Sequence, residues 1–234
     1  MMILKGVLAA VCAYMLGSLS MSICISKCVM NSDVRAHGSG NAGATNMARV
    51  FGLRLGVLTL AGDMLKAALA MLAGWLLLGE LGLCISGAAC LVGHCFPVLH
   101  EFRGGKGVSA GAAVLLAVDW RVLLAAVVCF AIFALLSRKV SLGSLGAAVM
   151  GFCAAAYLGV STPRLILAAF AMLIVMLRHR ENILRLIAGT EPDFKPAGEK
   201  KEKAGDDRMT TIDVNPPYTG GFYIFLTIAG ECIV

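Results

Sequence analysis

The amino-acid sequence predicts an all-α membrane protein, a polytopic bundle of about seven transmembrane helices. Two observations carry this prediction. Of the 234 residues, 59% are hydrophobic, whereas soluble domains are roughly 45 to 50% apolar. Several apolar runs also approach the length of about 20 residues that a helix needs to cross a bilayer. Together they exclude an ordinary soluble core.

Seven apolar segments follow one another along the chain, separated by polar breaks or breaks that contain Gly or Pro. The fourth is too short to cross alone, so we expect a half-helix or re-entrant piece whose backbone is buried in protein or hydrated. The nine cysteines lie mostly inside these runs and form no C-x-x-C pair, which favours small buried thiols over a disulfide framework. The segments are 3–24, 53–79, 82–100, 107–118, 122–136, 141–160 and 163–177.

Basic residues in the short loops predict the orientation, because Lys and Arg near span ends are retained on the cytoplasmic side. With the N-terminus outside and the C-terminus in the cytoplasm, the outer side holds only Lys5, Arg121 and Arg164. The net charge of +6 then follows from topology and needs no nucleic-acid partner. The cytoplasmic side holds Lys27, Arg35, Arg49, Arg54, Arg103, Lys106, Arg138, Lys139, Arg178, Arg180 and Arg185.

The chain is expected to divide near residue 190. Residues 1–190 form the predicted transmembrane domain, and residues 191–234 a cytoplasmic tail or divergent extension. Residues 189–213 are polar, charged and contain Pro and Gly, a composition that cannot bury a core. The last apolar run, Gly221 to Val234, is too short to span and either lies at the membrane interface or is an incidental extension.

The loop from Asp33 to Gly52 has the composition of an anion-binding site. Glycines let main-chain N–H groups approach an anion, hydroxyl and amide side chains add donors, and arginine supplies a planar fork for phosphate. The alternative is a tight loop capped by its own Ser and Asn side chains. The candidate phosphate-binding residues here are Gly38, Ser39, Gly40, Asn41, Thr45, Asn46 and Arg49.

A second loop, from His94 to Ser109, places a basic, glycine-rich turn before a new apolar segment. A helix N-terminus behind such a turn favours negative charge, and Lys106 adds a positive one. The P-loop spacing G-x-x-x-x-G-K-[ST] is missing, which argues against nucleotide hydrolysis. A positive anchor at the membrane surface is the alternative. The candidate phosphate-binding residues are Gly104, Gly105, Lys106 and Gly107.

Asp63 and Lys66 lie inside the second span, three residues apart and therefore on one helix face. Ionisable residues in a span usually pair and face the bundle interior. We therefore expect an ion pair that borders a polar cavity and supports the site, together with His94.

Two more polar groups lie at span ends. Ser141 and Ser144 begin the sixth span, where they bind phosphate or merely cap the helix. The stretch from Arg178 to Glu191 carries His179 and Asn182 among arginines, and an amphipathic interfacial helix is the alternative. Under the predicted topology these groups meet the two loops at one membrane face. Cations and hydrogen-bond donors outnumber carboxylates there, so the expected ligand is an anion. A lipid chain is expected between the helices. No metal or other cofactor is predicted.

At these residues the sequence resembles the PlsY family of bacterial membrane acyltransferases. The resemblance covers about residues 1–191 and rests on GSGNAGATN with Arg49 downstream, DMLK, GHCFPV followed by FRGGKGVS, SLGSL and RHRENILRLIAGTE, all in family order. It implies transfer of a fatty acyl group from acyl phosphate to the C1 hydroxyl of glycerol-3-phosphate, giving lysophosphatidic acid and phosphate. That is the first step of phospholipid synthesis and takes place at the bacterial inner membrane. Ala67, where the family commonly has Gly, and the chain beyond about Lys203 depart from the family.

Carried over position by position, the resemblance implies a catalytic set of Ser39, Arg49, Lys106, His179 and Asn182, with Ser144 and the glycines of the second loop beside it. Arg178 is expected to support this set. The H-x-x-x-x-D pair of other glycerolipid acyltransferases is absent, as is a Ser/His/Asp grouping. We therefore predict direct transfer without an acyl-enzyme, with phosphate taking the hydroxyl proton. The competing classes are an organic-phosphate transporter or channel, disfavoured because no internal repeat is visible, and a structural subunit.

Overall fold

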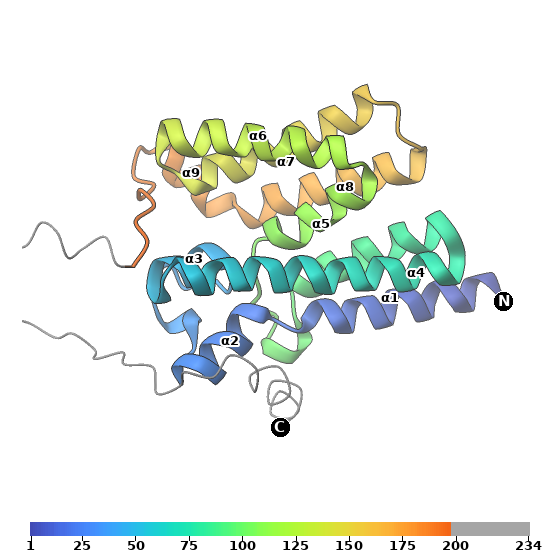
Figure 1. The fold of residues 1–234 in the computed structure, drawn as a ribbon, viewed down its shortest axis with the longest axis horizontal. Coiled ribbons are helices and arrows are strands. Elements are labelled where there is room, and N and C mark those ends of the chain that lie inside the picture. The colour runs from blue at the N-terminus through green and yellow to red at the C-terminus, as the bar shows by residue number, and fades with distance from the viewer. Residues whose placement is uncertain (198–234) are drawn as a thin grey trace, which may run out of the picture.

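The computed structural model describes residues 1–197, and every regular element in that range is helical, which confirms the all-α prediction (Figure 1). The helices are α1 (Met2–Ser18), α2 (Met21–Met30), α3 (Ala44–Phe51), α4 (Leu53–Cys95), α5 (Val108–Val118), α6 (Trp120–Ser137), α7 (Val140–Tyr157), α8 (Thr162–Arg178) and α9 (Arg180–Ile187), with short 3-10 turns η1 (Val34–Ala36) and η2 (Val98–His100).

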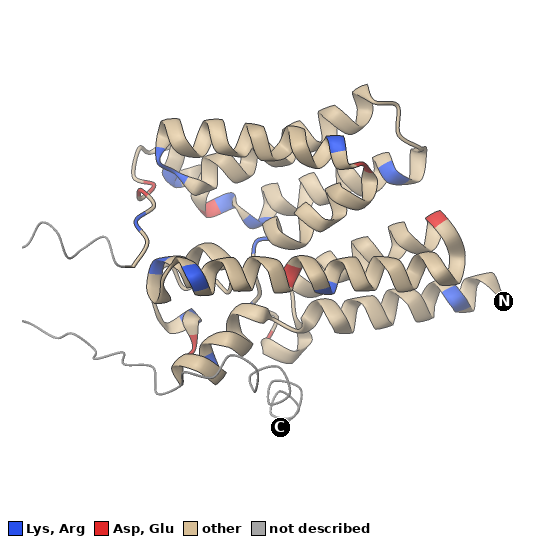
Figure 2. Ribbon diagram, in the orientation of Figure 1, with Lys and Arg blue, Asp and Glu red and all other residues tan. Residues whose placement is uncertain are grey.

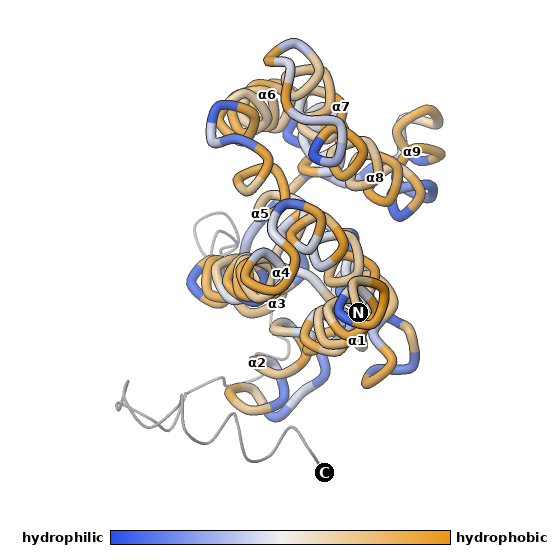
Figure 3. The backbone as a smooth tube through the Cα atoms, turned by 90° about the vertical axis from the view of Figure 1, so that its right-hand side faces the viewer, coloured by the Kyte–Doolittle hydropathy of each residue, from blue (hydrophilic) through white to orange (hydrophobic). Residues whose placement is uncertain are grey.

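Two groups of helices make up this fold. In Figure 3, α1 to α4 lie on one side and α6 to α9 on the other, with α5 between them. Within the groups, α1 packs along α4 and α6 packs along α7. Helix α5 contacts both α4 and α8, so this short apolar helix joins the two groups.

Helix α4 is a hairpin rather than one straight rod. The chain reverses at Leu78 and Gly79, whose backbone leaves the helical region, and Gly79 has a φ of +59°. The two limbs touch at Gly74 and Gly82, where an added Cβ on Gly82 would lie on the carbonyl oxygen of Gly74. Small residues of this kind let helices in membranes approach closely. The break expected between residues 79 and 82 is thereby confirmed.

The first expected span, residues 3–24, is not one continuous helix. Helix α1 ends at Ser18 and α2 begins at Met21. The hydroxyl of Ser18 donates to the carbonyl oxygen of Tyr14 at 2.9 Å, a back-bond that bends helices. At the break, Leu19 exposes its carbonyl oxygen to a hydrogen bond from Lys66. The interruption therefore brings a polar backbone group next to the ion pair in α4.

Four helical stretches of the described chain are long and apolar enough to cross a membrane, or five if α8 and α9, bent by 61°, form one broken span. One of the four, Leu53–His100, contains the α4 reversal and is counted once. At 11 residues, α5 is about 16 Å long and is as short as the sequence predicts. The number of seven crossings stays a prediction.

The outer surface is apolar, as expected for contact with lipid. Large side chains such as Leu76, Leu135 and Tyr157 are 71%, 79% and 90% exposed, more apolar surface than a soluble monomer tolerates. Charged residues gather instead at the end of the molecule that carries α3 and α9, away from the N-terminus (Figure 2). Most of the predicted tail, residues 198–234 with the run Gly221 to Val234, lies outside the described residues.

Candidate active site

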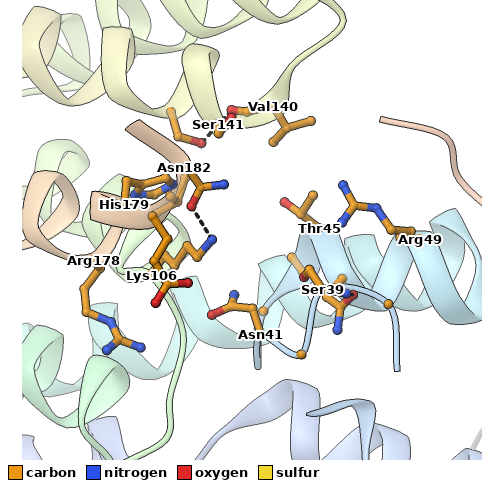
Figure 4. Close-up of a pocket in the computed structure, with 18 of the residues that line it drawn as sticks. Ser39, Asn41, Thr45, Arg49, Lys106, Val140, Ser141, Arg178, His179 and Asn182 are labelled. Atoms are coloured by element: carbon orange, nitrogen blue, oxygen red, sulfur yellow. Dashed lines mark hydrogen bonds between the residues drawn. The ribbon is translucent and has the colours of Figure 1, made fainter. Parts of the chain in front are cut away.

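A cavity of about 1910 Å³ lies between the two groups of helices. Its wall is drawn from α3 and the loop before it, the loop before α5, the start of α7, and the α8–α9 junction. These are the polar segments that the sequence singled out, although they are far apart in the chain. Figure 4 shows side chains of the first loop and α3 facing those of the second loop and the α8–α9 junction.

Asn46 holds the first loop in shape. Its amide nitrogen donates to the carbonyl oxygens of Val34 and His37, at 3.1 and 3.0 Å, and its Oδ1 accepts from the Ser39 N–H at 2.9 Å. At Gly38, φ is +59° and a Cβ would lie 2.3 Å from Oδ1 of Asn46, so only glycine fits. The Asn46 amide is thus occupied by the loop, which leaves phosphate contact to its neighbours.

Helix α3 presents polar side chains to the cavity one turn apart. Thr45 and Arg49 line the wall at i and i+4, and Ser39 and Asn41 lie beside them in the loop (Figure 4). Within residues 1–197, Arg49 makes no ion pair, so its guanidinium charge is available to an anion. Sequence reasoning treated residues 33–52 as one loop and did not foresee this helix.

The second loop is fixed from behind by Arg178. Its guanidinium donates to the carbonyl oxygens of Gly104 and Gly105, each at 3.1 Å, and stacks over the ring of Phe96 at 4.9 Å from its centroid. The N–H of Gly105 donates to the backbone oxygen of His94 at 3.1 Å. A Cβ on Gly105 would lie 2.3 Å from Nε2 of His94, which explains the glycine. Arg178 therefore positions the loop that carries Lys106.

Lys106 reaches across to the α8–α9 segment. Its ammonium group donates to Oδ1 of Asn182 at 2.5 Å (Figure 4). The Asn182 amide nitrogen donates to Oε1 of Glu191 at 2.6 Å. Burial lowers the pKa of the Lys106 ammonium, and the charge of Arg185 lowers it further, whereas Glu191 and Glu181 act in the opposite direction. The pocket therefore makes the Lys106 ammonium easier to deprotonate than an exposed lysine.

His179 lies in the break between α8 and α9 and is buried. Its Nδ1 is 2.8 Å from the carbonyl oxygen of Val175. Because a carbonyl oxygen only accepts, Nδ1 carries the proton, and in the neutral ring Nε2 is an acceptor. The ring is therefore set to receive a hydrogen bond from a hydroxyl group.

Glu191 and Arg185 are wall residues to which sequence reasoning assigned no role. Arg185 donates to Oε2 of Glu191 at 2.7 Å, and the Glu191 side chain is buried. Burial alone would raise the pKa of this carboxyl, but the Ser141 hydroxyl, the Asn182 amide and Arg185 together lower it below its usual value. The sequence signal that could have indicated Glu191 is its position as a carboxylate at the end of a stretch that contains several arginines and Asn182.

A buried polar network lies behind the second loop. The expected ion pair is confirmed, since Lys66 Nζ and Asp63 Oδ1 are 2.8 Å apart and both side chains are at most 5% exposed. Nδ1 of His94 lies 3.5 Å from the same oxygen, and the Ser109 hydroxyl donates to Oδ2 at 3.4 Å. His94 and Ser109 also line the cavity, so they connect the pair to its wall.

An apolar groove runs from the cavity between α5, α6, α7 and α8. Val108, Phe130 and Ser144 line both spaces. At Gly111 an added Cβ would meet nothing within 4 Å, so this glycine faces open space. The other residues of the groove are Ala112, Leu115, Leu123, Ala126, Val127, Ala147, Ala148, Ala171, Met172 and Val175.

The predicted site residues thus fall into two sets. Lining the cavity are Gly38, Ser39, Gly40, Asn41, Thr45, Asn46, Arg49, His94, Lys106, Ser141, Ser144, Arg178, His179 and Asn182. Behind the wall are Asp63, Lys66 and the glycines at 104, 105 and 107. Across residues 1–197, no three His, Cys, Asp or Glu side chains group as metal ligands would.

Comparison with known proteins gives concordant matches. A family model described as glycerol-3-phosphate acyltransferase matches residues 7–189. The glycerol-3-phosphate acyltransferase of Syntrophotalea carbinolica is 42% identical over 195 residues, covering 78% of this chain and 94% of that protein. That of Jannaschia sp. is 43% identical over 185 residues, covering 79% of this chain and 91% of its own length.

Two solved structures share the fold. The crystal structure of PlsY, an integral membrane glycerol 3-phosphate acyltransferase, in its glycerol 3-phosphate form superposes with a TM-score of 0.77. It is 35% identical, and the match covers 81% of this chain and 96% of that one. The lysophosphatidic acid form of PlsY gives a TM-score of 0.75 at 34% identity, covering 81% and 95%.

Proposed function

The chain belongs to the glycerol-3-phosphate acyltransferase family, and from that premise we propose that this integral membrane enzyme acylates the C1 hydroxyl of glycerol-3-phosphate with acyl phosphate as donor. The products are lysophosphatidic acid and inorganic phosphate. The observation that supports this donor is the presence of two cations, Arg49 from α3 and Lys106 from the loop before α5, on one cavity, because both reactants carry a phosphate group. A transporter would explain the cavity but not the family.

Each phosphate has a set of donors to bind it. The guanidinium of Arg49 in α3 and the hydroxyl of Ser39 in the first loop form one set, and the ammonium of Lys106 in the second loop provides the other. A guanidinium and an ammonium both suit phosphate oxygens. Hydrogen-bond donors that face developing negative charge also stabilise the transition state.

Direct transfer follows from the available groups. The C1 hydroxyl oxygen of glycerol-3-phosphate bonds to the acyl carbonyl carbon, and the bond from that carbon to the phosphate oxygen breaks. The hydroxyl proton passes to the departing phosphate, so no protein base is consumed. Nε2 of His179 accepts a hydrogen bond from the C2 hydroxyl and so orients glycerol-3-phosphate while the C1 proton stays available to the phosphate, and Asn182 holds Lys106 in place.

The acyl chain occupies the apolar groove. This groove begins at the cavity wall, where Val108, Phe130 and Ser144 are shared, and leads between helices into the apolar part of the molecule. A donor whose phosphate lies in the cavity would therefore extend its chain away from water. Gly111 keeps the groove open, because any side chain there would enter it.

The enzyme lies in the inner membrane of a bacterium, with its site facing the cytoplasm and its N-terminus on the outer side. Supporting this orientation, the basic residues gather at the end where α3 and α9 lie, and the positive-inside rule retains such residues in the cytoplasm (Figure 2). Glycerol-3-phosphate is water-soluble and would reach the cavity from that side.

The donor is tested by supplying the purified, lipid-embedded enzyme with palmitoyl phosphate, palmitoyl-CoA or palmitoyl-acyl carrier protein, and following labelled lysophosphatidic acid. The proposal predicts product from palmitoyl phosphate and none above background from the two thioesters. Product from a thioester at an equal rate would contradict it. Glycerol-3-phosphate uptake by proteoliposomes without donor would instead support transport.

A further inference from the structure

Residues 191–197, here called the strap, cross from one group of helices to the other at the cavity. The N–H of Phe194 donates to the carbonyl oxygen of Arg138, in the turn between α6 and α7, at 2.9 Å. The N–H of Ala197 donates to the carbonyl oxygen of Ala48, in α3, at 3.2 Å. Figure 1 shows this segment running past α9 towards α3. The strap also contributes six residues to the cavity wall, namely Glu191, Pro192, Asp193, Lys195, Pro196 and Ala197.

Lys139 anchors the start of the strap. Its ammonium group donates to the backbone oxygen of Glu191 at 2.9 Å and pairs with Asp193 Oδ1 at 3.0 Å. The ion pair with Asp193 is partly exposed, 25% and 42% for the two side chains, so it contributes little. The bond to the Glu191 carbonyl lies nearer the buried site and fixes the position of that residue.

Glu191 in turn sets the orientation of the Asn182 amide. Because a carboxylate only accepts, the Asn182 nitrogen must face Oε1 of Glu191, which leaves Oδ1 towards the ammonium of Lys106. Without Glu191 in place, the buried NH2 group loses its acceptor and only the Lys106 ammonium still holds the amide. The strap therefore acts on a group that we place in the active site.

We propose that Lys139 is a positioning residue: by holding the strap at the Glu191 carbonyl, it keeps the Glu191–Asn182–Lys106 chain aligned for glycerol-3-phosphate. The inference rests on the proposed function and adds a role for a residue outside the reacting groups. Lys139 touches no substrate in this account, since its ammonium group is taken up by the strap.

The test compares four full-length variants in lipid. Lys139→Met removes both contacts, and Lys139→Arg keeps a donor for the carbonyl. Asp193→Asn removes only the exposed ion pair. Arg138→Met is the matched control, because it removes a neighbouring positive charge whose side chain makes no hydrogen bond in residues 1–197. Each is assayed for the KM of glycerol-3-phosphate and for kcat, and hydrogen exchange is measured at the amides of Phe194 and Ala197.

Lys139→Met is expected to raise the KM for glycerol-3-phosphate about tenfold, the size of one lost charge-assisted hydrogen bond, and to speed exchange at both amides. Lys139→Arg should restore most of the affinity, and Asp193→Asn and Arg138→Met should stay within about twofold of the parent. Unchanged KM and exchange in Lys139→Met would overturn the inference while leaving the enzyme's activity intact. An inactive parent enzyme would instead count against the proposed function.

Discussion

The ammonium group of Lys106 donates a 2.5 Å hydrogen bond to Oδ1 of Asn182, which joins two segments 76 residues apart in the chain. Through Glu191 the same chain of contacts extends to Arg185 in α9. The cation that we assign to a phosphate is therefore held by a neutral amide rather than neutralised by a carboxylate. Its charge stays available to the substrate.

Replacing Glu191 tests this arrangement. Glu191→Ala removes the acceptor of the Asn182 amide, and we expect kcat/KM for glycerol-3-phosphate to fall about tenfold to a hundredfold, since a buried donor loses its partner. Glu191→Gln keeps an oxygen for Asn182 and should lose only a few-fold. Steady-state kinetics on both variants measure the difference, and equal losses would show that charge, not amide orientation, is what matters at this position.

The pH profile tests the state of Lys106. Because burial lowers its pKa, the ammonium loses its proton at a lower pH than an exposed lysine would, and phosphate binding weakens as pH rises through that pKa. Arginine stays protonated at all working pH values. We therefore expect the alkaline limb of kcat/KM to move to higher pH in Lys106→Arg, even if its maximum is lower. A limb at the same pH in both enzymes would assign the titration to another group.

The groove is tested by filling it. Gly111→Phe places a ring in the apolar groove, so the KM for palmitoyl phosphate should rise about tenfold or more, while a four-carbon acyl phosphate is used nearly as before. The KM for glycerol-3-phosphate should not change. Leu116→Phe, at a 47% exposed position of the same helix, is the control and should behave as the parent. Equal effects on both chain lengths would place the acyl chain elsewhere.

The buried pair is tested by stability. Asp63→Asn leaves the Lys66 charge without its partner, which costs about 3 to 5 kcal/mol for a fully buried pair, and should lower the Tm of the detergent-solubilised protein clearly. Adding Lys66→Met removes the stranded charge, so the double variant should recover part of the loss. If the double variant is no more stable than Asp63→Asn alone, the pair is not what holds these helices.

Much of the fold could be predicted from the sequence because long apolar runs indicate membrane helices. The break near residue 80 and the short segment before Asp119 appear in the structure where the pattern placed them. The interruption at Leu19 could not be predicted, because α1 and α2 are both apolar and the break is stabilised by a hydrogen bond from Lys66, 47 residues further along the chain. Long-range contacts of this kind leave no local pattern.

Most of the residues that line the cavity could be predicted from the sequence, but their arrangement could not. The hydroxyl group of Ser39 and the basic side chains of Arg49 and Lys106, each near glycines, indicate anion binding by composition alone. Glu191 was missed because a carboxylate repels phosphate, and its role here depends on the Asn182 amide that donates to it. The strap could not be predicted because two of its contacts are main-chain hydrogen bonds, which any sequence can make, and the contact with Lys139 joins residues 52 positions apart in the chain.

The most direct test of the account is the separate removal of the two cations, Arg49 in α3 and Lys106 in the loop before α5. Arg49→Ala and Lys106→Ala enzymes in lipid, supplied with palmitoyl phosphate and glycerol-3-phosphate, should each lose about 10²- to 10³-fold in kcat/KM, as when an oxyanion donor is removed. Folding is checked by an unchanged Tm. Turnover within a few-fold of the parent in either variant would contradict the claim that cations from distant segments of the chain jointly bind the two phosphorylated reactants.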